Sequence, residues 1–266
     1  MPSPGRRILR RRLDTELVER GLATSRAAAH DVISRGLVAV EGVPTPKPAT
    51  MVSSNQSVAV VTGDHRWASR GGEKLDAALR ACGLDIAGRR CLDVGASTGG
   101  FTDVLLERGA QSVVALDVGY GQLAWNLRRD PRVRVVERTN FRYVDPAAIG
   151  APFDVIVVDV SFIGISAIAR KLHDCGSAGT DLVVLVKPQF EVGKERVQRG
   201  GLVTDPAAHR DAISGVAGAL TDHGWAPRSL IASPITGAKG NREFFLHAVL
   251  RGSTALTAAE IDRAVA

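Results

Sequence analysis

Apolar and amphipathic segments alternate along the chain from about residue 73 to its end. Apolar side chains recurring every three to four positions predict helices at 73–82, 100–108, 163–173, 206–223 and 257–265. Uninterrupted apolar runs predict strands at 91–94, 113–117, 133–136, 154–160, 181–188, 229–233 and 244–250. Strands this apolar are typical of parallel sheets that are covered on both faces. The pattern therefore predicts an α/β fold with a doubly wound sheet, whose ligand site lies at the carboxyl ends of the strands.

The first 63 residues follow a different pattern. Short helices are predicted at 13–20 and 25–34, and short strands at 37–40 and 58–61. A core of this size is marginal, and such a module usually serves to present a surface. That surface is basic, because residues 1–70 contain 11 Lys and Arg against 6 Asp and Glu, a net charge of +5 out of +6 for the chain. The asymmetry indicates a polyanion-binding module beside a nearly neutral domain, rather than only a solvated basic tail.

The segment Cys91–Thr102 joins an apolar strand to a helix through small residues and glycines. Asp117 ends the next apolar strand. A strand, a glycine turn, a helix, a second strand and an acidic residue form the arrangement that grips the ribose of an adenosine cofactor. The spacing is not G-x-G-x-x-G, because Gly95 is the first glycine and position 97 is serine. The competing interpretation is an ordinary tight strand-to-helix turn.

Composition narrows the class of protein. The 266 residues are 45% hydrophobic and 23% charged, which is typical of a globular chain. No apolar run approaches the roughly 18–20 residues of a membrane helix, and the basic start lacks the apolar core of a secretory signal. Three scattered cysteines and six histidines without ligand spacing favour a reducing compartment and no metal site. We therefore expect a cytoplasmic protein.

Two charged residues close neighbouring apolar strands. Asp159 ends the run that begins at 154, and Lys187 ends the run that begins at 181. Burying an ammonium group is costly, and a carboxylate on the adjacent strand lowers that cost. Both side chains are therefore expected in the crevice beside Gly95. The pattern alone does not locate Lys74 or Glu243.

The amino-terminal module resembles the S4 RNA-binding domain over about residues 11–63. The resemblance rests on residues 12–14, 17–21, 25–26 and 33–42. It implies recognition of structured RNA through a basic helical face, by shape and phosphate contacts rather than base stacking. The candidate phosphate contacts are Arg11, Arg12, Arg20, Arg26, Arg35 and Lys47. For each of them an ordinary solvated charge is the alternative.

From about residue 70 to 251 the chain resembles the FtsJ-like RNA 2′-O-methyltransferases. With its S4-like amino end, it resembles the TlyA (hemolysin A) family of ribosomal RNA 2′-O-methyltransferases. The motifs that carry the resemblance are 69–75, 93–102, 117–123, 159–163, 185–191 and 240–246. The resemblance implies a Rossmann-like methyltransferase sheet with a small α+β S4-like domain. It also implies S-adenosylmethionine as cofactor and ribosomal RNA of the small subunit (16S), the large subunit (23S) or both as partner, with a cytidine as target.

The catalytic set of the family falls on Lys74, Asp159, Lys187 and Glu243. A lysine takes a proton only when neutral, so the ordinary lysine pKa of about 10.4 must fall at a basic lysine. By resemblance, Lys187 is the base, Lys74 and Glu243 orient the ribose and tune Lys187, and Asp159 holds a lysine near the methyl group. Taken singly, each could instead form a surface ion pair.

The cofactor-binding residues that the resemblance implies surround the glycine turn and the next two strand ends. They are Asp93, Gly95, Ala96, Ser97, Thr98, Gly99, Gly100, Asp117, Val118, Thr139, Asn140, Asp159 and Phe162. Phe162 is expected against cofactor or target base, with a core position as the alternative. Residues 189–201 are expected either to close over RNA or to form an ordinary loop.

The expected domains are 1–63 for the S4-like unit, of which 1–10 is a basic tail, then a 64–70 linker and 71–266 for the methyltransferase. Trp67 either pins the two domains together or packs locally. The absent G-x-G-x-x-G and the strand-end lysines argue against a nucleotide-dependent oxidoreductase. A noncatalytic RNA-binding or ribosome-assembly protein and a membrane-active hemolysin are the remaining alternatives, and the apolar pattern gives the latter no support.

Overall fold

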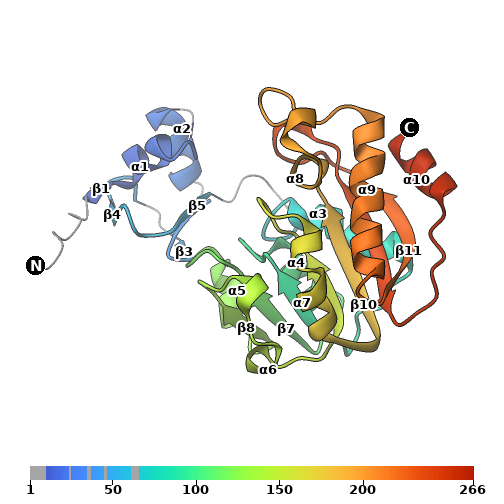
Figure 1. The fold of residues 1–266 in the computed structure, drawn as a ribbon. Helices are drawn as coiled ribbons and strands as arrows, with labels where there is room; N and C mark the ends of the chain where they lie inside the picture. Colours follow the sequence, from blue (N-terminus) through green and yellow to red (C-terminus); the bar gives the residue numbers. More distant parts are fainter. Residues whose placement is uncertain (1–9, 24, 35–36, 45–46, 61–65) are drawn as a thin grey trace, which may run out of the picture.

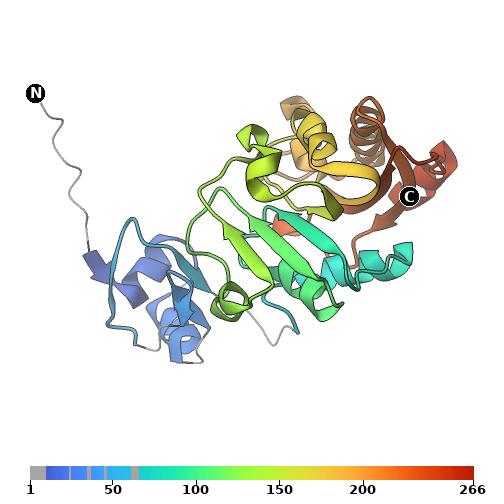
Figure 2. The same cartoon turned by 90° about the horizontal axis from the view of Figure 1, so that it is seen from below.

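The computed structural model describes residues 10–23, 25–34, 37–44, 47–60 and 66–266 (Figure 1). It contains a small amino-terminal module, β1 to β5, and a larger α/β part from α3 to α10. In both views the small module lies beside α5 (Figures 1 and 2). No helix in these ranges is both long and apolar enough to span a membrane.

The larger part is built on a seven-stranded sheet in the order β11-β12-β10-β9-β6-β7-β8. Neighbouring strands are parallel from β10 through β9, β6 and β7 to β8, and β12 pairs antiparallel with both β10 and β11. The strands are β6 (Arg90–Val94), β7 (Ser112–Leu116), β8 (Val133–Val136), β9 (Phe153–Val158), β10 (Gly176–Val186), β11 (Trp225–Ala232) and β12 (Phe244–Leu250).

Helices cover both faces of this sheet, as the continuously apolar strands predict. One core contains side chains of α3 (Gly71–Cys82), α4 (Gly100–Glu107) and α5 (Trp125–Arg129). The other contains side chains of α6 (Pro146–Ile149), α7 (Ala169–Asp174), α9 (Pro206–Thr221) and α10 (Ala258–Val265). Successive residues of one strand enter opposite cores, as Val155 and Ile156 do, so the doubly wound sheet expected from the sequence is confirmed.

The amino-terminal module has a core of its own. It consists of α1 (Leu13–Glu19), α2 (Arg26–Ser34) and a three-stranded sheet in the order β3-β2-β5. These strands are β3 (Val43–Pro44), β2 (Val38–Val40) and β5 (Val58–Val60), and Leu13, Leu17 and Ile33 are buried beneath them. A separate ribbon pairs β1 (Arg10–Arg12) with β4 (Met51–Ser53).

Some elements differ from the sequence-based expectation. The apolar pattern does not predict the β1 strand, because its three residues are exposed arginines. The strand forms by backbone pairing with β4. The helix expected at 163–173 is divided into a 3₁₀ turn, η2 (Ile165–Ala167), and α7. Short 3₁₀ turns also occur at η1 (Phe141–Tyr143), η3 (Lys194–Arg196) and η4 (Ala238–Gly240), and one further short helix is α8 (Pro188–Glu191). The β11 strand begins at Trp225, before the predicted 229, and its pairing shifts register after Pro227.

The described part of the expected linker, residues 66–70, packs against α4. Trp67 is 7% exposed, lies in the α3–α4 core, and donates from Nε1 to Glu107 at 2.6 Å. The backbone N–H of Ala68 donates to Asp103 at 2.8 Å. Trp67 therefore packs locally, which was one of its two expected roles.

The two parts also touch directly. A Cβ added to Gly42 would lie 3.0 Å from the Leu123 carbonyl oxygen, and one added to Gly121 would lie 3.0 Å from a carboxylate oxygen of Glu41. Glu41 itself accepts from the backbone N–H of Ser57 at 2.6 Å. The β2–β3 turn thus rests on the loop between β7 and α5.

Candidate functional site

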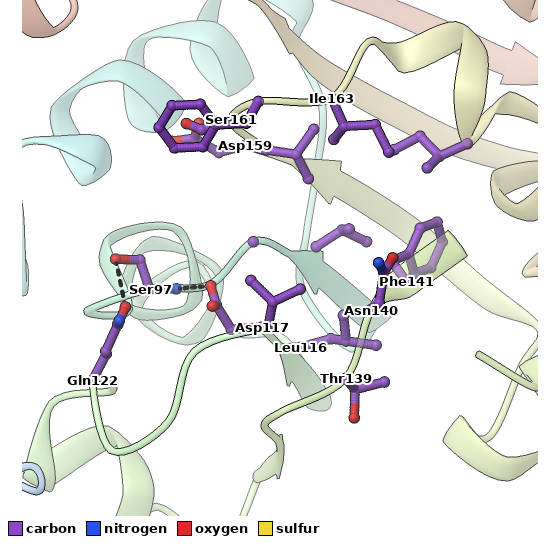
Figure 3. Close-up of a pocket in the computed structure, with 16 residues that line it drawn as sticks. Ser97, Leu116, Asp117, Gln122, Thr139, Asn140, Phe141, Asp159, Ser161 and Ile163 are labelled. Carbon is purple, nitrogen blue, oxygen red and sulfur yellow. Dashed lines mark hydrogen bonds between the residues drawn. The ribbon is translucent and has the colours of Figure 1, made fainter. Parts of the chain in front are cut away.

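The glycine turn after β6 is held open by backbone geometry. Gly95 has a φ of 89°, and a Cβ there would overlap the carbonyl oxygen of Asp159 on the neighbouring strand end. The Asp117 carboxylate accepts from the backbone N–H of Ser97 at 2.8 Å, so the second strand end fixes the turn (Figure 3). Asp117 also accepts from the N–H of Gly119 at 2.6 Å. The ends of β6, β7 and β9 are thereby locked together around Gly95.

A cavity of about 340 Å³ lies on one side of this turn. Most of its exposed wall area is apolar, and its polar groups include the Asp117 carboxylate and the Asn140 amide (Figure 3). The other side chains that line it include Leu116, Val118, Gln122, Thr139, Phe141, Asp159, Ser161, Phe162 and Ile163. An apolar slot with a carboxylate at its edge suits a flat heteroaromatic ring joined to a diol.

A second cavity of about 270 Å³ adjoins the first. The two share Gly95, Ser97 and Asp159 as lining residues. Lys74 enters the second cavity from α3, and the remaining lining comes from the turn, the segment before α3 and the loop after β11. Those residues are Ser69, Arg70, Gly71, Ala96, Thr98, Gly100, Phe101, Thr236 and Gly237.

Two lysine–carboxylate pairs reach these cavities through one member each, since Asp159 lines both cavities and Lys74 lines the second. Lys187 Nζ lies 2.5 Å from Asp159 Oδ1 and donates to Ser161 Oγ at 3.1 Å. Lys74 Nζ donates to Glu243 Oε2 at 2.6 Å, where the two side chains are 11% and 3% exposed. A Cβ on Gly237 would overlap the Glu243 carboxylate, so a side chain at this position would have to displace the carboxylate from its present place. The structure thus brings all four sequence-predicted catalytic residues to one end of the sheet.

Asp93 lies behind the glycine turn. It is fully buried and accepts from Thr102 Oγ1 at 2.7 Å, while its other oxygen has no hydrogen-bond partner among the described residues. Burial raises the pKa of Asp93 to about 7, although the Thr102 hydrogen bond opposes the rise. Neither Asp93 nor Gly99 lines either cavity, whereas the other predicted cofactor residues line one or both. A Cβ on Gly99 would instead meet Leu123 and Leu127.

Phe162 stands at the mouth of the first cavity. Its side chain is 92% exposed, its φ is 67°, and its ring lies 5.3 Å from that of Phe190. A bulky residue in the left-handed backbone region is uncommon, and this conformation costs conformational free energy. The exposure excludes the alternative that Phe162 is a core residue.

The loop around Phe162 is anchored by Glu191. Its carboxylate accepts from the backbone N–H of Ile165 at 3.0 Å, and burial raises the pKa of Glu191 to about 7 despite this hydrogen bond. The same contact fixes the start of the segment 189–204, because Glu191 belongs to that segment. The other end of the segment is fixed by Asn241, which is 3% exposed and binds the N–H of Val203 and the carbonyl of Gly201. The segment from 189 to 204 is therefore held at both of its ends.

Several lining residues were not singled out from the sequence. Gln122 contacts Ser97 Oγ at 3.5 Å, and Ser161 contacts Lys187. Both lie inside motifs that the sequence shows, so a closer reading of those motifs would have found them. Thr236 and Gly237 lie in a loop with no such signal, and only the fold places them beside Lys74.

The predicted phosphate contacts of the small module are mostly paired within it. Arg12 and Arg26 both bind the buried Asp14, at 2.9 and 3.0 Å, and Arg11 pairs with Glu19 at 3.1 Å. The hydrogen bond from the Arg12 guanidinium holds the pKa of Asp14 well below its usual range. Hydrogen bonds from Arg26 and His30 lower this pKa further, whereas burial acts to raise it.

Arg20 departs most from the expectation. It binds Glu16 at 2.9 Å and donates to the carbonyls of Gln56 and Ser53, so its geometry favours a structural role over RNA contact. Lys47 is exposed, and Arg35 lies outside the described residues. Within the described ranges no group of three His, Cys, Asp or Glu is arranged to hold a metal ion.

Comparison with known proteins places this geometry among methyltransferases. Residues 67–249 match the family model of the FtsJ-like methyltransferases, and residues 11–58 match the S4 domain. The chain is 51% identical to the 16S/23S rRNA (cytidine-2′-O)-methyltransferase TlyA of Mycobacterium tuberculosis, over 96% of each protein. It is 38% identical to Hemolysin A of Brachyspira hyodysenteriae, over 90% of this chain and all of that one. A solved structure described as a hemolysin, from Streptococcus thermophilus, superimposes with a TM-score of 0.74 at 35% identity, over 97% of this chain and 95% of that one.

Proposed function

Because the chain belongs to the FtsJ-like methyltransferases, and within them to the TlyA family, we propose that it methylates a ribose 2′-hydroxyl of ribosomal RNA. The observation that carries the proposal is the pair of adjoining cavities that share Gly95 and Asp159. The first has the lining of an adenosine site, and the second has Lys74 at its wall, while the shared Asp159 is paired with Lys187.

The residues of the first cavity fit S-adenosylmethionine, which would supply an electrophilic methyl group. Asp117 has lone pairs left for ribose hydroxyls after accepting two backbone N–H groups. Leu116, Val118 and Phe141 offer apolar surface to adenine, and Asn140 offers an amide beside it. Because Gly95 lacks a Cβ, the turn packs directly against the Asp159 carbonyl, and both residues border the two cavities.

Lys187 is the residue that we assign as the base. A ribose hydroxyl is a weak nucleophile, and its proton must move to a neighbouring group as the hydroxyl attacks. Lys187 Nζ has an oxygen partner on each of Asp159 and Ser161, and a substrate hydroxyl can take the place of the weaker, 3.1 Å contact with Ser161. Asp159, which lines both cavities, then holds the lysine in position.

Lys74 and Glu243 are assigned to ribose orientation. Their pair is more enclosed than Lys187 and Asp159, and Gly237 closes tightly around the carboxylate. Holding a reacting group in line with its partner accounts for a large share of the rate enhancement in such transfers. The exposed ring of Phe162, at the cavity mouth, is assigned to stacking on the target base.

The small module is assigned to binding of structured RNA, with Lys47 and the exposed parts of Arg11, Arg12 and Arg26 contacting phosphates. By family membership the proposed substrate is a cytidine of 16S or 23S ribosomal RNA, in a ribosomal subunit and in the cytoplasm. The proposed domain boundaries are those expected from the sequence, with 1–63 as the RNA-binding unit and 71–266 as the methyltransferase.

The test is transfer of labelled methyl groups from S-adenosylmethionine to separated small and large ribosomal subunits, followed by mapping of ribose methylation. Label at a 2′-hydroxyl supports the proposal and identifies the nucleotide. Label on a base atom contradicts it. Cofactor binding without any transfer to either subunit would favour a noncatalytic assembly protein, and a reaction without added enzyme provides the background.

A further inference from the structure

Glu191 is a carboxylate that the proposed mechanism does not use, and it lies behind the loop that carries Phe162. It ends α8, the short helix that follows Lys187. Burial raises the pKa of Glu191 to about 7, and no cation among the described residues forms an ion pair with it. A carboxylate that is withdrawn from water without a counter-charge is costly, and such groups cluster at functional sites. The contacts of Glu191 therefore indicate what it does.

Two neighbouring side chains of α8 contact the loop. The carboxylate oxygens of Glu191 lie 3.0 and 3.3 Å from the backbone nitrogen of Ile165 and accept its N–H. The Phe190 ring lies 5.3 Å from the Phe162 ring, at an interplanar angle of 50°. The loop passes so close to Glu191 that a Cβ added to Gly164 would lie 3.2 Å from Oε2. An aromatic contact and a hydrogen bond thus hold the loop at two separate points.

The backbone of Phe162 needs such support. Its φ of 67° is costly for a bulky residue, and a costly conformation persists only where the surrounding contacts fix it. The side chain is 92% exposed, so packing in a core does not supply those contacts. Ser161 and Ile163, on either side of Phe162, line the first cavity (Figure 3). A relaxed backbone here would move both the ring and the cavity wall.

We propose that Glu191 is a positioning residue, which holds the loop through the Ile165 N–H and thereby keeps the Phe162 ring at the mouth of the first cavity. The loop requires a hydrogen-bond acceptor of the right reach, because no cation among the described residues pairs with the negative charge of Glu191. This inference rests on the proposed function, in which Phe162 stacks on the target base.

Two substitutions separate the reach of the side chain from its charge. Glu191→Gln keeps an acceptor oxygen at the same reach, so kcat for methyl transfer to ribosomal subunits should stay within about threefold of wild type. Glu191→Asp keeps the charge but is one methylene shorter. Its kcat should fall by about 10-fold or more, while KM for the subunits and cofactor affinity change by less than about threefold. Glu195→Asp shortens an exposed carboxylate of the same segment and should leave all three quantities unchanged.

A double-mutant cycle with Phe162→Ala identifies the path of the effect. If Glu191 acts through Phe162, Glu191→Asp should change kcat by less than about threefold in the Phe162→Ala background, because coupled positions are not additive. A general loss of stability would lower kcat by the same factor in both backgrounds. Such additivity overturns the proposal, as does wild-type kcat in Glu191→Asp, or a loss in Glu191→Gln as large as that in Glu191→Asp.

Thermal unfolding establishes that each variant is folded. If Glu191→Asp does not fold, Gly164→Ala replaces it, because the added methyl group would lie 3.2 Å from Glu191 Oε2 and push the carboxylate away from Ile165. Its kcat should fall in the same way, and an unchanged kcat refutes the proposal. If the wild-type protein methylates no ribosomal RNA, the proposed function fails and this inference fails with it. If the wild type is active and Glu191→Asp is equally active, only this inference fails.

Discussion

The two lysine–carboxylate pairs of the site are alike in distance and different in surroundings. Lys187 and Asp159 lie at the ends of adjacent parallel strands, where the two side chains are 12% and 24% exposed. Lys74 and Glu243 join a helix to the start of the antiparallel strand β12, and Glu243 is only 3% exposed. In the more open pair Asp159 lines both cavities, whereas the enclosed pair also ties two elements together. We therefore expect the first to carry the chemistry and the second to combine positioning with stability.

The largest effect is expected at Lys187. Removing a general base typically lowers turnover by about 10²–10⁴-fold, so Lys187→Ala should lose methyl transfer while cofactor affinity stays within a few fold. Lys187→Arg is the sharper control, since arginine can keep the ion pair with Asp159 but does not give up its proton. Methyl transfer on ribosomal subunits and calorimetric cofactor titration measure the two quantities. Activity retained in Lys187→Arg would remove the base assignment.

Glu243→Gln should separate positioning from stability. The change leaves the Lys74 ammonium enclosed without a counter-charge, which typically costs about 3–5 kcal/mol in a buried pair. Thermal unfolding should show this loss, together with a fall in methyl transfer smaller than that of Lys187→Ala. Asp159→Asn, at the more open pair, is the matched variant and should destabilise less. Equal destabilisation in the two variants would abolish the distinction.

Asp93 offers a test that depends on pH. Its pKa of about 7 in the folded protein lies above the ordinary aspartate value, so the stability that it contributes is present at low pH and is lost as pH rises toward 7. Asp93→Asn keeps an oxygen for Thr102 and should remove this loss, stabilising the protein by roughly 2–4 kcal/mol at pH 8 and by little at pH 4. Denaturant unfolding at both pH values measures the difference. An identical pH dependence in the two proteins would contradict the burial argument.

The smallest effects are expected in the small module. Lys47→Gln should lower the salt dependence of RNA binding by about one counterion, since one phosphate contact is lost. Arg20→Gln should leave that slope unchanged and instead lower stability, because Arg20 binds Glu16 and two backbone carbonyls. Filter binding across a salt series distinguishes them. If Arg20→Gln lowers the salt dependence of RNA binding as much as Lys47→Gln does, Arg20 is an RNA contact after all.

The difference between the pairs also explains what the sequence could predict. Asp159 and Lys187 each follow an apolar strand, so the rule for strand ends in parallel sheets brought them together correctly. Lys74 and Glu243 are 169 positions apart in the sequence. No local sequence pattern shows that the start of a helix will lie beside the start of the antiparallel strand β12. Their convergence was expected only from family resemblance. The paired arginines of the small module show the same limit, because a charge pattern does not tell an unpaired arginine from one bound to Asp14.

The loop from Asp117 to Trp125 has a consequence for how the chain can vary. On one side Val118 and Gln122 form part of a cavity wall, and on the other Gly121 and Leu123 support the β2–β3 turn of the small module. An insertion or deletion here would displace a ligand wall and a domain contact in one step. The length of this loop is thus constrained from two sides, and natural variants of the chain should accommodate added residues elsewhere, such as the exposed turn at Gly200.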